Sequence, residues 1–275
     1  MHARLETDDT QPLIEVDQME VNFDGNVVLR DIGLSVPKGQ TLAIIGESGC
    51  GKTVLLKTLI GLVAPTQGEI RFDGENINQL SEGDLTKLRI RYGFVFQNAA
   101  LFDSMTVGQN VAFPLRQHTT KPIEEIREIV YSLLAEVGLP DSIVWKKPAE
   151  LSGGMRKRVG LARALVLKPE IVLYDEPTTG LDPIMSDVIN ELILRTRGRY
   201  PVTSIVVTHD MRTAQKVADR VVMMYPAPRL EEGEPQILFD GPPEELEDFH
   251  DNRVTQFVRG EAGQRLMEMR EAADF

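Results

Sequence analysis

The stretch that decides the fold is Gly46-Glu-Ser-Gly-Cys-Gly-Lys52-Thr53, which has the spacing Gly-x4-Gly-Lys-Thr. It follows the apolar run at residues 41–45 and precedes a segment of helical character that extends to about Leu62. This strand–loop–helix order is the context that a phosphate-binding P-loop requires. The glycines let backbone N–H groups approach phosphates, and the start of the helix adds partial positive charge. The sequence therefore predicts a nucleoside triphosphate site with these contacts: Gly46, Glu47, Ser48, Gly49, Cys50, Gly51, Lys52, Thr53 and Val54.

Two residues of this loop have distinct predicted roles. Lys52 would reach the β- and γ-phosphates, and the Thr53 hydroxyl would bind Mg²⁺. Cys50 is the only cysteine of the chain, so no intrachain disulfide can form, and we interpret it as a small filler of the loop.

A second glycine-rich segment, Leu151-Ser-Gly-Gly-Met155, opens a basic helix about 100 residues further on. Ser152, Gly153 and Gly154 could offer a hydroxyl and backbone N–H groups to a phosphate at a helix N-terminus. The alternative is an ordinary N-cap serine followed by a plain loop. Because one nucleotide has one set of phosphates, this segment predicts a site completed by another copy of the chain.

A third segment, Ile171-Val-Leu-Tyr-Asp175-Glu176, is an apolar strand that ends in two carboxylates. Asp175 fits a ligand of Mg²⁺, and Glu176 fits a general base that orients and deprotonates an attacking water. Taken alone, the pair could equally be a solvated strand end. Its position after a P-loop favours catalysis.

The remaining patterns predict an α/β protein. Residues 13–36 alternate between apolar and polar, as antiparallel strands do, with a turn at residues 23–26. Strands are expected at residues 68–74, 92–96, 171–174, 204–207, 220–224 and 236–239. Helices are expected at residues 123–137, 155–167 and 184–196, and the strand–helix–strand alternation indicates a mainly parallel sheet. We expect a flexible N-terminus at residues 1–11, one domain at 12–241 with a helical subdomain at about 98–168, and a helical tail at 242–275.

Composition limits the partners. The 275 residues carry a net charge of −12, which argues against nucleic acid and against a generally positive surface for anionic lipid. We find neither the apolar run of a signal peptide nor 18 uninterrupted apolar residues. We therefore expect any membrane association to depend on a partner.

Taken together, these segments resemble the motifs of ABC ATPases, in the order of that family. Gln97 resembles the Q-loop glutamine, Thr179-Gly-Leu-Asp182 the D-loop, and Thr208-His209-Asp210 the switch-histidine segment. The resemblance implies a P-loop ABC ATPase fold in which a parallel core sheet is joined by an antiparallel β subdomain. It also implies ATP and Mg²⁺ as cofactors and a homodimer.

The same resemblance assigns further roles. Gln97 would bind Mg²⁺ and sense the lytic water, and His209 would contact the γ-phosphate and steady Glu176. Asp182 would cross the dimer interface. Phe23 lies where the family places an aromatic ring that stacks on adenine, although a phenylalanine at a strand end is more often core.

The segment at residues 100–119, the methionine at 155 and the tail at residues 251–258 are similar to ATPases of Mla/Mce-type phospholipid transporters. This implies a peripheral subunit on the cytoplasmic side of the inner membrane, bound to an integral MlaE-like permease near Leu101, Phe102 and Met105. A small STAS-type regulatory subunit, and an MCE-domain subunit through the permease, would complete the assembly. The alternatives are an importer ATPase for amino acids or another small solute, or a soluble ABC ATPase such as an iron–sulfur assembly factor.

Overall fold

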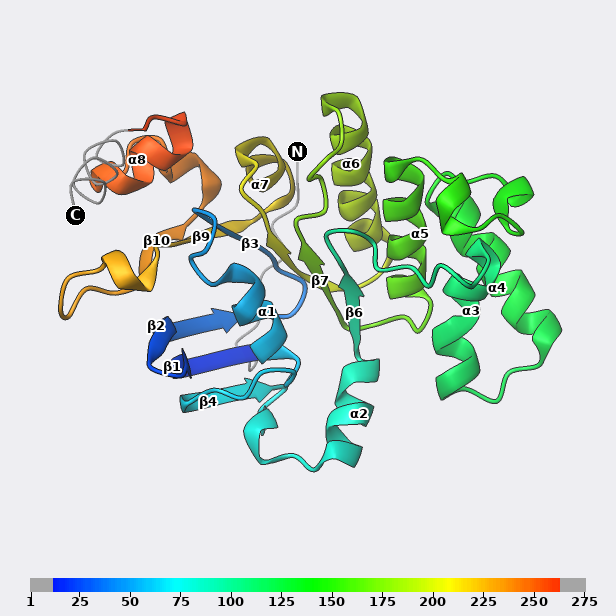
Figure 1. Ribbon diagram of the computed structural model, residues 1–275, viewed down its shortest axis with the longest axis horizontal. Helices are drawn as coiled ribbons and strands as arrows, with labels where there is room; N and C mark the ends of the chain where they lie inside the picture. The colour runs from blue at the N-terminus through cyan, green and yellow to red at the C-terminus, as the bar shows by residue number, and fades with distance from the viewer. Residues whose placement is uncertain (1–11, 263–275) are drawn as a thin grey trace.

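The computed structural model describes residues 12–262 and contains two β-sheets (Figure 1). The first is antiparallel, with strand order β2-β1-β4-β5. Its strands are β1 Ile14–Phe23, β2 Asn26–Val36, β4 Gln67–Phe72 and β5 Glu75–Asn76. β1 and β2 pair through the predicted turn, where Phe23 lies opposite Asn26. The antiparallel part of the fold prediction is confirmed.

The second sheet has the order β10-β9-β3-β8-β7-β6, and its strands are parallel except for β10 at one edge. The strands are β3 Thr41–Gly46, β6 Tyr92–Val95, β7 Ile171–Asp175, β8 Thr203–Val207, β9 Arg220–Met224 and β10 Ile237–Gly241. Every residue of β3, β7 and β8 is buried. Such continuous apolar runs are typical of strands covered on both faces.

Helices connect and cover the sheets (Figure 1). They are α1 Lys52–Leu59, α2 Glu82–Ile90, α3 Val107–His118, α4 Ile123–Glu136, α5 Gly153–Leu165, α6 Pro183–Arg199, α7 Met211–Val217 and α8 Asn252–Arg259. α1 contacts β2 of the first sheet and both β3 and β7 of the second. The helix that follows the P-loop therefore lies between the two sheets.

α3, α4 and α5 pack on one another, at the right of Figure 1, and share one apolar core with β7. That core includes Val111, Leu134 and Val159, and it is distinct from the core under α1.

Several helix boundaries differ from the prediction by one to three residues, and two of these differences have a clear local cause. α5 begins at Gly153 rather than Met155, because Ser152 caps the helix with its hydroxyl and both glycines join the first turn. α1 ends at Leu59 rather than Leu62, and Gly61 has a left-handed φ of 66° that stops the helix.

α2 and α7 were not predicted. The expected loose N-terminus at residues 1–11 and residues 263–275 of the expected tail lie outside the described residues. Across residues 12–262, no helix is both long and apolar enough to cross a membrane.

Candidate nucleotide site

A cavity of about 500 Å³ opens between the end of β3 and the carboxyl ends of β7 and β8. Ligands bind at this edge in open α/β sheets. The lining residues are Val28, Gly46, Glu47, Ser48, Gly49, Gly51, Lys52, Thr53, Val54, Gln97, Glu176, His209 and Phe257. The structure thus brings together most of the predicted nucleotide-contacting loop with Gln97, Glu176 and His209.

Two glycines of the loop are required by its path. Gly46 has a φ of 144°, and a Cβ there would lie 2.2 Å from the Met224 carbonyl oxygen. Gly51 has a φ of 96°, and its Cβ would lie 2.7 Å from Leu29 Cδ2. Side chains at either position would force the loop away from the sheet, so these glycines keep the backbone N–H groups close to the cavity.

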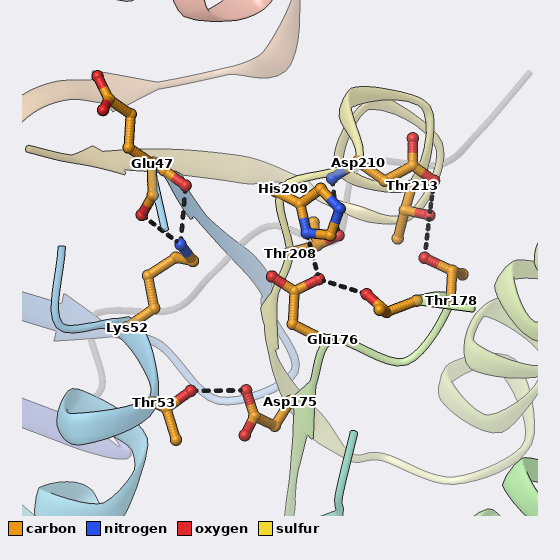
Figure 2. A network of polar contacts seen from close by, with 12 residues as sticks. Glu47, Lys52, Thr53, Asp175, Glu176, Thr178, Thr208, His209, Asp210 and Thr213 are labelled. Carbon is orange, nitrogen blue, oxygen red and sulfur yellow. Dashed lines mark hydrogen bonds and ion pairs between the residues drawn. The ribbon is translucent and has the colours of Figure 1, made fainter. Parts of the chain in front are cut away.

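Lys52 is 7% exposed, and its ammonium donates to the carbonyl oxygens of Gly46 and Glu47 at 2.7 and 2.9 Å. Figure 2 shows the side chain turned back along the loop. The positive charge is thus held beside the backbone that would surround phosphates.

Thr53 lines the cavity, and its hydroxyl donates at 3.0 Å to Oδ1 of Asp175, the last residue of β7 (Figure 2). Burial raises the pKa of the Asp175 carboxyl, and the hydrogen bond from Thr53 opposes that rise. A hydroxyl and a buried carboxylate at this distance are oxygen donors of the kind that Mg²⁺ prefers.

Glu176 directly follows β7, and its carboxylate contacts two side chains. Its Oε2 accepts a hydrogen bond from Thr179 Oγ1 at 2.9 Å and lies 2.8 Å from His209 Nδ1. The carboxylate is 12% exposed while the histidine side chain is 59% exposed. The acid predicted to be the general base is therefore oriented at the cavity wall, with the predicted switch histidine beside it.

Glu47 of the P-loop forms an ion pair that the sequence did not predict. Arg229, in the 3₁₀ turn Ala227–Arg229, donates to Glu47 Oε2 at 2.7 Å. The guanidinium also lies 4.6 Å from the Tyr225 ring centroid. Since Glu47 lines the cavity, Arg229 balances a negative charge where anionic phosphates would bind.

Gln236 ties the P-loop to the antiparallel sheet. Its amide donates to the carbonyl oxygens of Cys50 at 3.0 Å and Val28 at 3.1 Å, and it is completely buried. Cys50 itself is 1% exposed and lies under the loop, where burial raises the pKa of its thiol. This position agrees with a filler and keeps the thiol protonated.

The second glycine-rich segment lies elsewhere in the fold. Ser152, Gly153 and Gly154 are not among the described residues that line the cavity. The Ser152 hydroxyl accepts from Met155 N at 3.2 Å and so caps α5.

Four further predicted residues also lie outside the described lining of the cavity: Cys50 and Asp175, whose contacts are given above, and Asp182 and Phe23. Asp182 caps α6 through bonds from the amides of Ile184 and Met185, both at 3.0 Å. Phe23 is 47% exposed at the end of β1, and its stacking role stays a prediction.

Several residues at the site were missed by sequence reasoning. Thr179 lies in the D-loop segment, so its proximity to Glu176 could have been expected from a separation of three residues. Phe257 is on α8, and Arg229 and Gln236 are about 180 residues from the loop they contact. No local pattern marks such contacts.

Comparison with known proteins agrees with this geometry. The family model described as "ABC transporter" matches residues 29–179. One relative is a Mycobacterium tuberculosis protein named probable ribonucleotide transport ATP-binding protein mkl. It is 41% identical over 90% of this chain, and this chain spans only 66% of its length. The intermembrane phospholipid transport system ATP-binding protein MlaF of Haemophilus influenzae is 42% identical over 92% of both chains.

Solved structures resemble the whole fold. A CbiO subunit from Clostridium perfringens, part of an ABC transporter complex, superposes with a TM-score of 0.76 at 29% identity and covers 97% of this chain and 100% of its own. A dimeric ATP-binding cassette bound to ADP and Pi gives 0.74 at 30% identity, covering 84% of this chain and 98% of its own.

The chain therefore has the P-loop ABC ATPase fold, and the predicted fold class is confirmed. It belongs to the ABC transporter family.

Proposed function

We propose that this chain hydrolyses ATP to power a membrane transporter for phospholipids of the Mla/Mce type. The observation that carries the proposal is the similarity to MlaF, which is 42% identical and extends over 92% of both chains. The segment at residues 100–119, which follows the predicted nucleotide sensor Gln97, supports the same subfamily.

The active unit would be a homodimer with two composite sites. Each ATP would lie in the cavity of one chain and meet the N-terminus of the partner's α5, with Ser152, Gly153 and Gly154. Two features support this: that segment lies apart from the P-loop cavity of its own chain, and a similar cassette is dimeric with ADP and Pi. Asp182 would lie at the interface.

Hydrolysis would depend on the chain's own side chains. Glu176, fixed by Thr179 and His209, would accept a proton from the attacking water, and Lys52 would stabilise the phosphates. Mg²⁺, held by Thr53, Asp175 and Gln97 together with phosphate oxygens, would neutralise the developing charge. ATP would favour the closed dimer because that state binds it more tightly, and product release would reopen it.

An apolar groove on the helical part supports a permease partner. It has a volume of about 390 Å³ and is lined by residues that include Phe94, Phe96, Phe102, Phe113 and Pro114. Phe96 and Phe102 remain 39% and 42% exposed. A short apolar helix of an integral, MlaE-like permease fits such a groove.

This geometry refines the predicted docking residues. Leu101 packs against the core of the helical part, so it supports the groove, whereas Phe102 faces it. We propose that the chain sits on the cytoplasmic side of the inner membrane through this contact. A STAS-type subunit and an MCE-domain subunit are the further proposed partners.

The test is purification of the native complex from membranes, followed by reconstitution into vesicles that contain fluorescent phospholipid. We expect an integral membrane partner, copurifying phospholipid, and ATP-dependent movement of the fluorescent lipid. Purification with no integral partner would remove the transporter proposal.

Transport of a small solute in place of lipid would favour the second candidate function, which is an importer ATPase for a small solute. The mkl name of the mycobacterial relatives makes ribonucleotides the specific alternative. Radiolabelled ribonucleotide in the same vesicles is therefore the matched comparison.

A further inference from the structure

Glu176 has a backbone conformation that its surroundings must maintain. Its φ is 50°, in the left-handed region that non-glycine residues rarely adopt. Such a conformation is strained and persists only where neighbouring groups fix it. On one side, Glu176 N donates to the Val207 carbonyl of β8 at 2.9 Å.

On the other side, the Glu176 carbonyl oxygen accepts a hydrogen bond from the Lys157 ammonium at 3.2 Å. Lys157 lies on α5 and is 7% exposed. Burying an ammonium is costly unless it is hydrogen-bonded. The hydrogen bond to the Glu176 carbonyl oxygen therefore offsets part of the cost of burying Lys157, and it also holds the backbone of Glu176.

Lys157 also connects two parts of the fold with different proposed tasks. It lies five positions after Ser152, about 8 Å along a rigid helix. The N-terminus of α5 would meet the partner's nucleotide, while Lys157 contacts the residue proposed as the base for the chain's own nucleotide. A shift of α5 along its axis would thus move the backbone of Glu176.

We propose that Lys157 is a positioning residue that fixes the main chain of Glu176 and thereby links the two composite sites of the dimer. The link between sites rests on the proposed homodimer. The positioning of Glu176 rests only on contacts within one chain.

The first experiment measures ATPase activity and nucleotide affinity of the purified full complex. Lys157→Met keeps the length of the side chain and removes its donor. We expect kcat to fall by about 10–100-fold, because a displacement of about 1 Å in a catalytic group has an effect of this size. Binding of a fluorescent ATP analogue should change less than about twofold, and the Hill coefficient for ATP should fall towards 1. Lys157→Arg keeps a donor and should recover most of kcat.

Arg158→Met is the matched control. Arg158 is on the same helix and donates to the Gly138 carbonyl at 2.8 Å, away from the cavity. We expect it to lower the melting temperature while kcat stays within about twofold of the unmodified protein. An unchanged kcat in Lys157→Met, or an equal loss in Arg158→Met, would overturn the positioning role.

The second experiment places Lys157→Met in a Glu176→Gln background and follows ATP-dependent dimerisation by light scattering. Glu176→Gln alone should trap an ATP-bound dimer, and the double variant should trap it equally well, because α5 still presents Ser152. Loss of the dimer only in the double variant would mean that Lys157 supports the Ser152 segment, and it would overturn the inference. A monomer in Glu176→Gln alone would instead contradict the proposed dimer and remove the link between sites, while the kcat comparison would still decide the positioning role.

Discussion

His209 Nδ1 lies 2.8 Å from Glu176 Oε2, the same carboxylate oxygen that accepts the hydroxyl hydrogen of Thr179. One oxygen of the proposed base is therefore in contact with two neighbours. The two neighbours come from different loops, one after β7 and one after β8. This arrangement leads to separate predictions for each.

Replacing His209 with Ala should lower kcat by about 100-fold, within the range usual for loss of acid–base assistance. ATP affinity should change little, because the P-loop contacts remain. Steady-state ATPase assays and equilibrium binding of a fluorescent ATP analogue measure the two quantities. A large loss of affinity with normal kcat would contradict this role.

Thr179→Val removes one donor with almost no change in shape. We expect kcat to fall only about tenfold, because His209 still holds the carboxylate. In the double variant with His209→Ala, the two losses in activation free energy should be less than additive. Thr86→Val is the control, because Thr86 is an exposed threonine on α2 whose hydroxyl donates to the Glu82 carbonyl oxygen at 2.9 Å. Equal losses in the two threonine variants would argue against a local effect on Glu176.

Arg229→Met should weaken ATP binding by about tenfold, which corresponds to about 1.4 kcal/mol. The variant leaves the Glu47 carboxylate without its guanidinium beside the phosphates, and methionine can still pack on Tyr225. Glu47→Gln in the same chain should restore affinity by removing the repelling charge. If the double variant binds no better than Arg229→Met, the arginine supports the loop through packing and not through charge.

Phe102→Ser together with Phe113→Ser should release the chain from its permease without loss of nucleotide binding. The two rings lie 4.8 Å apart in the groove, and apolar anchors of this kind often contribute 2 kcal/mol or more to an interface. Pull-down of the membrane partner and ATP binding are the two readouts. Ile123→Ser, a 59% exposed apolar residue on α4 outside the described groove lining, should have no effect on the pull-down. Retention of the permease by the double variant would place docking elsewhere.

Much of the fold was predictable because the deciding segments are contiguous. The apolar run before Gly46 and the run before Asp175 both became buried parallel strands that end at the cavity. Local order was enough to place Lys52, Thr53, Asp175 and Glu176 at one sheet edge. The start of α5 was misjudged because two glycines suggested a loop, whereas the Ser152 cap stabilises a helix through them.

What could not be predicted depends on contacts between distant segments. The bond from Arg229 to Glu47 and the bond from Gln236 to Cys50 O join residues about 180 positions apart, and no sequence period encodes them. Lys157 stands in the basic run at residues 156–158, yet α5 packs against β6 and Lys157 is 7% exposed, with its ammonium on the Glu176 carbonyl oxygen. α2 was missed because its charged sequence has weak periodicity, although Ser81 capping Asp84 N is a local signal that could have marked it.

Burial of Lys157 also predicts how stability depends on pH. Burial lowers the pKa of this lysine to about 8 in the folded chain, against an ordinary value of 10.5, and the charge of Glu176 opposes the decrease. Between these two pH values the unfolded chain binds more protons at this site, so rising pH favours the folded state. Relative to Lys157→Met, the protein should therefore gain stability from about pH 8 to about pH 10.5, by up to about 3 kcal/mol. Urea unfolding at pH 7, 8, 9 and 10 measures that difference. The difference in free energy of unfolding between the unmodified protein and Arg158→Met should not change with pH, because a guanidinium keeps its proton throughout. If the difference for Lys157→Met is also independent of pH, the ammonium is not desolvated, and water surrounds its contact with Glu176.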